Sequence, residues 1–449
     1  MQNYQVAIIG SGAGGARAAL MAARKGFSVA LIESHLLGGV CLHEGCLPIK
    51  CLSASEKMHR RVQNSSRYGV ESEIVSSYLH DWVGRQRLIL TRLSEDLEYD
   101  LAKAGVKRIH GRAAFRDAYT LDIISEHFNT EIRAENIIIA TGLRSAVPQY
   151  PRHPRIGDHR IFLKMLEAPK DVIIVGGGFT GCEFASILNS LGTHVMLVEG
   201  GARLVPTLDA SASDYLVRDF EARGISVLLG SEAAIMLSDD QPSVLVGGKV
   251  LHSEFVLVTG QRHVQLDGLG LDNAGVVTMP DRIPTNEFMQ TSQPHIYAVG
   301  DVNGITPQAH AAIAQGETAV YHLAGEARPY NASNVPQCVY TYPEIAQVGV
   351  TESDAEAAGL NTISATVEFR AVAKAMAIGE SEGFVKLTAA RATGALLGGV
   401  IVGSMASELV SQISTILKFK GTAADLAEIA MPYPTFSQAL RKCAWRLRG

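Results

Sequence analysis

Two cysteines, Cys41 and Cys46, lie close together in the segment GGVCLHEGCLPIK. A regular helix would hold their Cα atoms about 8.6 Å apart, whereas a disulfide needs about 4.4–6.8 Å. The chain must therefore bend between them, and Gly45 permits the bend while Pro48 suits the first turn of a helix. Cys46 then begins a helix, where the helix dipole favours a thiolate, and Lys50 lies one turn further on. We interpret the pair as a redox-active dithiol; the alternative is two thiols that are neighbours in sequence only.

A glycine-rich segment precedes the cysteines and is typical of a dinucleotide-binding unit. Residues Tyr4–Glu33 have the pattern strand, glycine turn, helix, strand, with Gly10, Gly12, Gly15 and Glu33 at the expected spacing. The first glycine permits a tight turn, the second lets the backbone approach a pyrophosphate, and the third allows close packing of helix on strand. The acid accepts a hydrogen bond from a ribose hydroxyl. The sequence thus predicts a dithiol beside a bound dinucleotide, which suits two-electron transfer between a flavin and sulfur.

The same unit recurs later in the chain, in residues Asp171–Glu199. Its glycines are Gly176, Gly178 and Gly181. Two such units indicate two bound dinucleotides, and the alternative is a repeated unit kept only for packing. The carboxylate of Glu199 favours NADH because it would repel the 2′-phosphate of NADPH. Arg203 is close enough in sequence to leave NADPH open.

The rest of the chain alternates between helical and β-rich stretches. We expect helices at about Ile49–Arg67 and Leu79–Ala104, and a strand at Asn136–Leu143. Two further strand-then-glycine segments are Glu254–Arg262 and His295–Gly304. After Pro329 the pattern becomes that of an α+β domain, with β-rich stretches Gln337–Val350 and Gly383–Thr388 and helices Ser404–Lys418 and Ala423–Ile429.

The composition excludes several classes of protein. With 449 residues, of which 47% are hydrophobic, the chain is long enough for two to four domains. A net charge of −5 gives no reason to expect nucleic acid as a partner. No apolar run has transmembrane length and no signal peptide is recognisable, so we expect a cytoplasmic protein without a membrane partner. Six cysteines in a chain of this length do not indicate a disulfide scaffold, and the spacing of the histidines does not support a metal site.

Together these segments resemble the flavoprotein pyridine nucleotide–disulfide oxidoreductases, and the motifs are most similar to the dihydrolipoamide dehydrogenase branch. The resemblance covers nearly the whole chain. Besides the two glycine loops and the cysteine segment, the matching positions are Thr141, Gly142, Glu183, Gly260, Gly300, Asp301, Ala309, His310 and Val339–Glu352.

The resemblance implies an α/β fold with two Rossmann-like domains and a C-terminal α+β dimerisation domain. Residues 1–143 and 271–329 would form the FAD-binding domain, residues 144–270 the NAD(P)-binding domain, and residues 330–449 the dimerisation domain. FAD would bind the first unit and NAD the second. The chain would form a homodimer in which the other subunit completes the active site.

The resemblance also implies roles for single residues. Cys46 would be the thiolate that faces the flavin, and Cys41 the thiol that exchanges with substrate. Lys50 would lie near the flavin and pair with Glu183, and a cation there stabilises negative charge on the reduced ring. Asp301 would hold the ribityl chain. The residues implied in cofactor binding are Gly10, Gly12, Gly15, Glu33, Lys50, Ala113, Thr141, Gly142, Gly176, Gly178, Gly181, Glu199, Gly260, Asp301, Ala309 and His310.

The chain departs from the pattern at its C-terminal end. Members that reduce disulfides carry a histidine followed by proline, with a glutamate four residues after the proline that orients the histidine. Here Tyr433 replaces the histidine and Gln438 the glutamate, while Pro434 and Thr435 are kept. A positioned general base contributes about 10²–10⁴-fold in rate, and tyrosine, with a reference pKa near 10, is a poor base at neutral pH. His43, between the two cysteines, is the one alternative base that is near in sequence.

No named branch of the family fits completely. Mercuric reductases and soluble transhydrogenases share the tyrosine, but the former carry a C-terminal cysteine pair, of which only Cys443 is present, and the latter generally lack the disulfide. Cys51, Cys182 and Cys443 are interpreted as packing residues, and Gln315 stands where the family often has glutamate.

We therefore expect an FAD-dependent NADH oxidoreductase that passes electrons through Cys41 and Cys46 to an acceptor that needs little acid–base help. A metal ion, a quinone or an activated disulfide would meet that condition. The alternatives are a mercuric-reductase-like metal reductase and a non-enzymatic flavoprotein that acts as a redox sensor or an assembly subunit.

Overall fold

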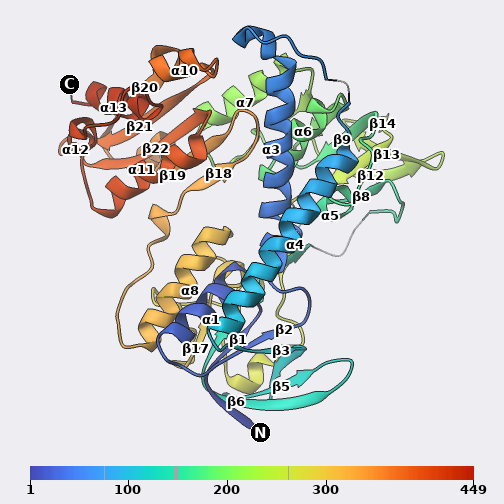
Figure 1. The fold of residues 1–449 in the computed structure, drawn as a ribbon, viewed down its shortest axis with the longest axis vertical. Coiled ribbons are helices and arrows are strands. Elements are labelled where there is room, and N and C mark those ends of the chain that lie inside the picture. The colour runs from blue at the N-terminus through green and yellow to red at the C-terminus, as the bar shows by residue number, and fades with distance from the viewer. Residues whose placement is uncertain (75, 146–149, 261, 449) are drawn as a thin grey trace. The chain divides into compact units, whose positions relative to one another are not determined.

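The computed structural model describes residues 1–74, 76–145, 150–260 and 262–448, which divide into two compact units (Figure 1). The first unit comprises residues 1–48, 86–147 and 261–332, and the second comprises residues 49–85, 148–260 and 333–449. Most residues of the predicted NAD(P)-binding and dimerisation domains lie in the second unit, and so do residues 49–85 of the predicted FAD-binding domain.

The first unit is built on a mixed sheet whose centre is parallel. The strand order is β3-β2-β1-β6-β5-β4, and β17 also pairs with β6. The parallel strands are β1 (Gln2–Ile9), β2 (Val29–Glu33), β3 (Lys107–His110), β6 (Asn129–Ile139) and β17 (Ile296–Ala298). β4 (Arg112–Phe115) and β5 (Thr120–Ile124) are antiparallel additions. Residues Val6–Ile9 of β1 are buried throughout, as a parallel strand covered on both faces requires.

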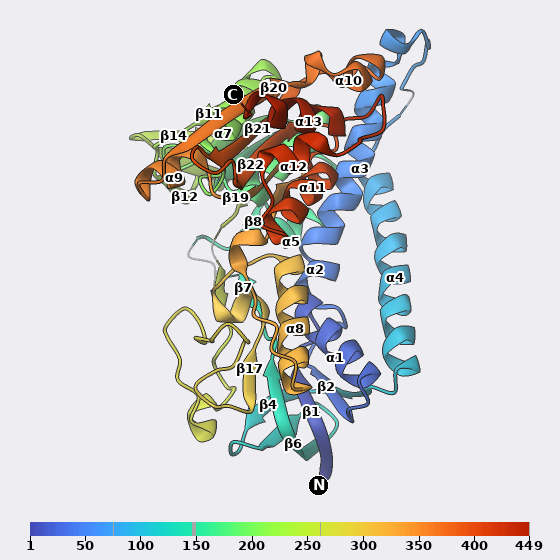
Figure 2. The ribbon, with the colours of Figure 1, turned by 90° about the vertical axis from the view of Figure 1, so that its left-hand side faces the viewer.

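Helices α1 (Ala13–Arg24) and α8 (Ala309–Leu323) run side by side along this unit, as Figure 2 shows. Small residues permit their close contact. A Cβ on Gly14 would lie 2.8 Å from the carbonyl oxygen of Ala312, and one on Gly316 would lie 2.6 Å from that of Gly14. This packing fixes the helix that follows the first glycine loop.

The second unit contains a parallel sheet with the order β11-β10-β9-β15-β8. Its strands are β8 (Ile156–Asp158), β9 (Asp171–Val175), β10 (His194–Val198), β11 (Ser226–Leu228) and β15 (Phe255–Val258). The helices that accompany it are α6 (Phe179–Ser190) and α7 (Ala210–Ala222). A three-stranded antiparallel sheet of β12 (Ala233–Ser238), β13 (Gln241–Val246) and β14 (Lys249–His252) follows β11 in the chain. Both units thus contain the βαβ arrangement that the glycine motifs predict.

The C-terminal part of the second unit is a five-stranded antiparallel sheet with the order β18-β19-β22-β21-β20. Its strands are β18 (Gln337–Val339), β19 (Ile345–Gly349), β20 (Thr362–Glu368), β21 (Gly383–Ala390) and β22 (Leu396–Gly403). Helices α11 (Ala406–Lys418), α12 (Ala423–Glu428) and α13 (Ser437–Arg446) contribute to its core. The predicted α+β character of this region is confirmed.

Two long helices, α3 (Cys46–Gln63) and α4 (Leu79–Lys103), occupy the region between the first glycine loop and the β-rich segments. The predicted helix at Ile49–Arg67 in fact begins at Cys46 and ends at Gln63, followed by a 3₁₀ turn at Ser65–Tyr68. Within the described residues, no helix is both long enough and apolar enough to cross a membrane.

Candidate redox site and nucleotide-binding loops

The first glycine loop has the backbone geometry of a dinucleotide site. Gly10 has φ +101°, and a Cβ there would lie 2.4 Å from the carbonyl oxygen of Ala140. A Cβ on Gly15 would lie 2.0 Å from the carbonyl oxygen of Gly10, so the helix can approach the strand only at glycine. Gly12 faces open space at the start of α1, and no side chain caps that helix. The uncapped N–H groups are therefore available to a pyrophosphate.

The acid that closes this unit is held by the loop itself. Oε2 of Glu33 accepts hydrogen bonds from the backbone N–H of Ser11 (2.9 Å) and from its hydroxyl (2.7 Å), and Oε1 accepts from His35 N–H (2.8 Å). Two residues after β6, the hydroxyl of Thr141 is buried and has no hydrogen-bond partner among the described residues. Gly142 has φ +67°, which favours glycine. A buried hydroxyl without a partner beside an uncapped helix fits the phosphate and ribose of FAD.

The remaining predicted FAD residues lie in the same unit. Asp301 belongs to the 3₁₀ turn η3 (Gly300–Asn303), where burial raises the pKa of its carboxyl and the charge of Arg262 opposes that rise. Ala309 and His310 are the first two residues of α8. The side chain of Ala113 is buried in β4, so its contact with a cofactor would have to involve the backbone.

Gln315 fixes the turn that carries Asp301. Its Oε1 accepts hydrogen bonds from Gly300 N–H (2.7 Å) and from the amide of Asn303 (2.8 Å). The sequence alone shows only that an amide stands where the family often has glutamate. The structural role could not be predicted from spacing, because its partners lie in another element.

The second glycine loop repeats the geometry of the first. Gly176 has φ +113°, Gly178 faces open space before α6, and a Cβ on Gly181 would lie 1.9 Å from the carbonyl oxygen of Gly176. Oε2 of Glu199 accepts from Gly177 N–H at 2.5 Å, and Oε1 accepts from Gly201 N–H at 2.6 Å.

Two other predicted residues lie near this loop. Gly260, which follows β15, has φ +101° and open space at its Cβ position. Arg203 is half-buried and makes no hydrogen bond or salt bridge within the described residues. The second glycine loop thus has the same two features as the first, an uncapped helix and a carboxylate, and both suit a bound dinucleotide.

The cysteine segment rests on the first glycine loop. Cys41 lies in the short helix α2 (Gly39–His43) and Cys46 is the first residue of α3; both are half-buried. Gly38 N–H donates to the hydroxyl of Ser11 (3.0 Å), and a Cβ on Gly39 would lie 2.8 Å from the Cα of Gly12.

Ser11 therefore links Glu33 to the cysteine segment, a role that its sequence position did not reveal. His43 Nε2 lies 2.7 Å from the carbonyl oxygen of Leu37, so this ring is held by the main chain of its own segment.

Lys50 and Glu183 form the predicted ion pair. Their Nζ and Oε1 atoms are 2.9 Å apart, and the side chain of Glu183 is only 4% exposed. The same oxygen accepts from Tyr340 N–H (2.9 Å), and the ammonium lies 4.1 Å from the centre of the Tyr340 ring. The contribution of Tyr340 was missed by sequence reasoning because β18 is remote in the chain. A lysine held by a buried carboxylate and an aromatic ring has a fixed position.

The other cysteines are packing residues, as predicted for Cys51, Cys182 and Cys443, which are all buried. Burial raises the pKa of the Cys443 thiol to about 12, and its Sγ donates to the carbonyl of Ala365 (2.9 Å). Burial also raises the pKa of Cys338 to about 12. These thiols stay protonated at neutral pH and are poor nucleophiles.

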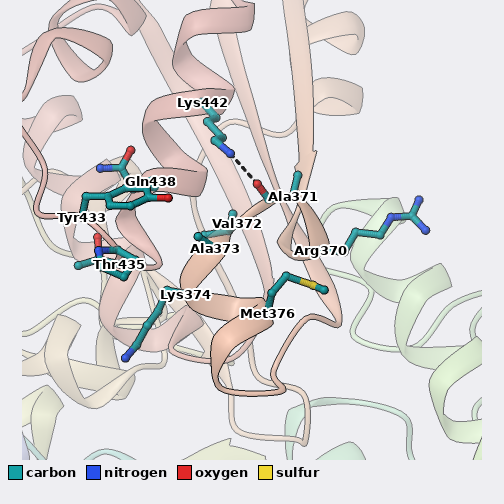
Figure 3. Close-up of a pocket in the computed structure, with 11 residues that line it drawn as sticks. Arg370, Ala371, Val372, Ala373, Lys374, Met376, Tyr433, Thr435, Gln438 and Lys442 are labelled. Carbon is teal, nitrogen blue, oxygen red and sulfur yellow. Dashed lines mark hydrogen bonds between the residues drawn. The ribbon is translucent and has the colours of Figure 1, made fainter.

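Tyr433 and Gln438 do not form a pair that resembles a histidine and its orienting glutamate. Tyr433 is 77% exposed. The amide of Gln438 donates to the carbonyl oxygens of Met431 (3.0 Å) and Pro432 (3.3 Å), so it fixes the preceding loop instead of the tyrosine. Both side chains line a cavity, shown in Figure 3.

Each of the two glycine loops precedes a helix without a side-chain cap and lies beside a hydrogen-bonded glutamate, Glu33 or Glu199. A cysteine pair lies at the start of a third helix. These features define an oxidoreductase that binds two dinucleotides and carries a dithiol. Residues 4–316 match the model of the pyridine nucleotide-disulphide oxidoreductases, and residues 335–444 match the dimerisation domain of the same proteins. The chain belongs to the pyridine nucleotide-disulphide oxidoreductase family.

Relatives and solved structures agree with this assignment. The chain is 36% identical to a dihydrolipoyl dehydrogenase of Chlorobaculum parvum, over 98% of the chain and 96% of the relative. It is 33% identical to one of Bacillus subtilis, over 99% and 98%. The crystal structure of LpdA from Mycobacterium tuberculosis has a TM-score of 0.93 at 27% identity and covers 100% of both chains.

A further structural neighbour is the HOCl-induced flavoprotein disulfide reductase RclA from Escherichia coli. It has a TM-score of 0.89 at 24% identity, covers 99% of this chain and 100% of that chain, and shows the fold alone. From the family and its relatives, the protein is a dihydrolipoyl dehydrogenase-like flavoprotein oxidoreductase that uses FAD and NAD(H).

Proposed function

We propose that this enzyme oxidises NADH and delivers two electrons through Cys41 and Cys46 to an acceptor whose reduction needs no general acid or base. Bound FAD supplies the carrier that accepts hydride from NADH and reduces sulfur. The acceptors that meet this condition are an activated disulfide, a quinone or a metal ion. Lipoamide is a poor acceptor in this proposal.

The observation that carries the proposal is the state of the C-terminal loop. The position expected to hold a histidine carries Tyr433, and Gln438 is engaged with two backbone carbonyls. Dithiol exchange with an ordinary disulfide needs a base to activate the attacking thiol and an acid to protonate the leaving thiolate. An acceptor with a stable leaving thiolate needs no acid, and its reactive disulfide is attacked fast enough by the small fraction of thiol that is ionised without a base.

The chain's own residues divide the remaining work. Cys46, at the start of α3, has the position in which the helix dipole stabilises a thiolate. The ammonium of Lys50 is held in place by Glu183 and would stabilise negative charge on the reduced flavin. Cys41 is the thiol that attacks the acceptor.

The nucleotide-binding residues hold the two cofactors. The loop at Gly12, with Glu33 and Thr141, binds FAD, and the loop at Gly178, with Glu199, binds NADH in preference to NADPH. Residues 1–143 and 271–329, 144–270 and 330–449 are proposed as the FAD, NAD(P) and dimerisation domains. A homodimer is proposed because residues 335–444 match a dimerisation domain.

A steady-state assay of purified holoenzyme with NADH against lipoamide, Hg(II), a quinone and an activated disulfide tests the proposal. We expect fast reduction of at least one of the last three and slow reduction of lipoamide. Lipoamide turnover as fast as that of the other acceptors would contradict the role given to Tyr433.

The alternative expected from the sequence, a flavoprotein that binds partners without catalysis, is disfavoured by the family and its relatives, which are oxidoreductases. The intact dithiol segment and both open glycine loops argue against it. Addition of NADH under anaerobic conditions distinguishes the two: the enzyme gives a long-wavelength charge-transfer band that Cys46→Ser abolishes. Failure of NADH and NADPH to reduce the flavin would favour the non-catalytic protein.

A further inference from the structure

The segment Tyr340–Tyr342 follows β18 in the second unit, and we call it the tyrosine segment. Two of its N–H groups donate to side chains of α6. Tyr340 N–H donates to Oε1 of Glu183 (2.9 Å). Tyr342 N–H donates to Oγ of Ser186 (3.1 Å). Because Glu183 and Ser186 are three residues apart in α6, the tyrosine segment is fixed to one face of this helix at two points.

Helix α3 also holds the tyrosine segment. The hydroxyl of Ser53 donates to the carbonyl oxygen of Tyr340 (2.8 Å). Oε1 of Glu56 accepts hydrogen bonds from the hydroxyl of Ser186 (2.7 Å) and from Nε of Arg60 (3.0 Å). The side chains of Ser53, Glu56 and Ser186 are all buried. Buried polar groups that bond to one another keep a fixed arrangement, because the loss of one leaves its partners unsatisfied in the interior.

The ammonium of Lys50 is held by two groups that the tyrosine segment carries or bonds to. It lies 4.1 Å from the centre of the Tyr340 ring and 2.9 Å from Oε1 of Glu183, the oxygen that also accepts Tyr340 N–H. The side chain of Lys50 is 27% exposed, so burial alone does not fix the ammonium. A shift of the tyrosine segment would therefore disturb both contacts of Lys50.

We propose that Ser186 is a positioning residue for the oxidation of NADH and acts on Lys50 through the tyrosine segment. Ser53 has the same role from α3. The inference rests on the proposed function, because it takes Lys50 as the cation that stabilises negative charge on the reduced flavin. NADH transfers a hydride, which carries two electrons, to bound FAD and leaves as NAD⁺, so negative charge develops on the flavin in this step. A cation stabilises that charge best when its position is fixed before the reaction.

Rapid mixing of the oxidised holoenzyme with excess NADH under anaerobic conditions gives two quantities, the limiting rate of flavin reduction and the apparent Kd of NADH. We expect Ser186→Ala to lower the limiting rate about three- to tenfold, because the contact of Lys50 with the Tyr340 ring is weakened. The apparent Kd should be unchanged. Ser53→Ala should have the same effect, so the inference can still be tested if Ser186→Ala does not fold.

A combined variant shows whether Ser186 acts through Lys50. Lys50→Met removes the cation and should lower the limiting rate at least as much as Ser186→Ala. Adding Ser186→Ala to Lys50→Met should cause no further loss, because the group that Ser186 positions is already absent. Ser190→Ala is the matched control: Ser190 is also buried on α6, but its hydroxyl donates to the carbonyl of Ile187 in the same helix (2.7 Å). This control should keep the wild-type rate.

Hydrogen exchange of backbone amides tests the same link without flavin reduction. Ser186→Ala should speed exchange at Tyr342, which loses its acceptor, and also at Tyr340, because the tyrosine segment is loosened as a unit. Ser190→Ala should change neither amide.

The possible failures are distinguishable. If Ser186→Ala leaves the limiting rate and exchange at Tyr340 as in wild type, or lowers the rate equally with and without Lys50→Met, the inference is overturned while the proposed function stands. If Lys50→Met itself keeps the wild-type rate, the role given to Lys50 in the proposed function fails, and the inference fails with it.

Discussion

Tyr433 and Gln438 are the residues at which the sequence departs from the family pattern of a histidine with an orienting glutamate. Histidine exchanges a proton near neutral pH and tyrosine does not, and glutamine lacks the negative charge of glutamate. The amide of Gln438 bonds to Met431 and Pro432, so the loop keeps its conformation without a catalytic pair.

Restoring that pair should restore turnover of ordinary disulfides. We expect Tyr433→His combined with Gln438→Glu to raise kcat/KM for lipoamide by about 10–10³-fold, because a positioned base contributes about 10²–10⁴-fold. The measurement is NADH oxidation with lipoamide from pH 6 to 9. Tyr433→Phe is the matched control and should leave lipoamide turnover at its low level. A double variant as slow as wild type would mean that another feature limits lipoamide.

We expect Glu199 to set the preference between NADH and NADPH. Both of its oxygens accept backbone N–H groups, so the carboxylate has a fixed position at the end of β10. We expect Glu199→Gln to shift the ratio of kcat/KM for NADPH to that for NADH at least about tenfold towards NADPH, because the charge that repels a 2′-phosphate is removed. Glu33→Gln, which alters the other loop, should not change that ratio. A preference for NADPH in the wild type would contradict the assignment.

Several contacts at the residue scale could not be predicted from the sequence. The Lys50–Glu183 pair was predicted only because the family motif joins the two positions. Ser11 and Tyr340 complete the cysteine segment and the ion pair, yet no local spacing marks either of them. Their partners are brought to them by the fold.

Helix starts were predicted well at the scale of the element, because they depend on local chemistry. The bend at Gly45 and Pro48 places a helix start at Cys46, and α3 begins there, three residues before the helical stretch expected at Ile49–Arg67. The end of this helix was predicted less accurately, because α3 ends at Gln63 and a 3₁₀ turn follows at Ser65–Tyr68. The same residue types favour α-helix and 3₁₀ turn, which differs in its tighter hydrogen bonding. A side chain of α3 also contacts the residue after β18, through the bond from the Ser53 hydroxyl to the carbonyl of Tyr340 (2.8 Å).

Asp209 connects two elements through its charge. It caps the start of α7, where its Oδ1 accepts from Ser211 N–H (2.9 Å), and its Oδ2 lies 3.1 Å from Nζ of Lys386 on β21. Burial alone would raise the pKa of the Asp209 carboxyl, but the hydrogen bonds from Ser211 and the charge of Lys386 outweigh it and hold the pKa below its usual range.

The stability that this carboxylate contributes should therefore depend on pH. It is fully present above the pKa of an unfolded aspartate, near 3.9, and is lost as the pH falls through the lower pKa of the folded protein. We expect Asp209→Asn to cost about 1–3 kcal/mol at pH 7 and progressively less below about pH 4. Urea unfolding at each pH measures the difference. Asp214→Asn, on the exposed side of α7, should cost little at any pH, and an equal cost for both variants would contradict the pairing.

The order of motifs along the chain predicted the architecture of the whole molecule. Each glycine motif lies between a parallel strand and the helix that follows it, and the two motifs belong to different sheets. The C-terminal part forms a separate antiparallel sheet. The division of the described residues into two units was not predicted. Composition does not change where residues 49–85 pass from one unit to the other, so the sequence carries no signal for that boundary.

The choice of acceptor is a property of the whole molecule, because the dithiol works only when both dinucleotides are bound. The prediction at this scale is that the acceptor is reactive without protonation. The ratio of kcat/KM for the activated disulfide dithiodipyridine to that for lipoamide measures this requirement.

The central claim, that Cys41 and Cys46 form a working dithiol without a general base, is tested most directly by reoxidation of the reduced enzyme. The wild-type holoenzyme is reduced anaerobically with one equivalent of NADH and mixed rapidly with lipoamide or dithiodipyridine. We predict that lipoamide reoxidises it at least about 100-fold more slowly than dithiodipyridine at neutral pH. Equal reoxidation by the two disulfides would contradict the claim.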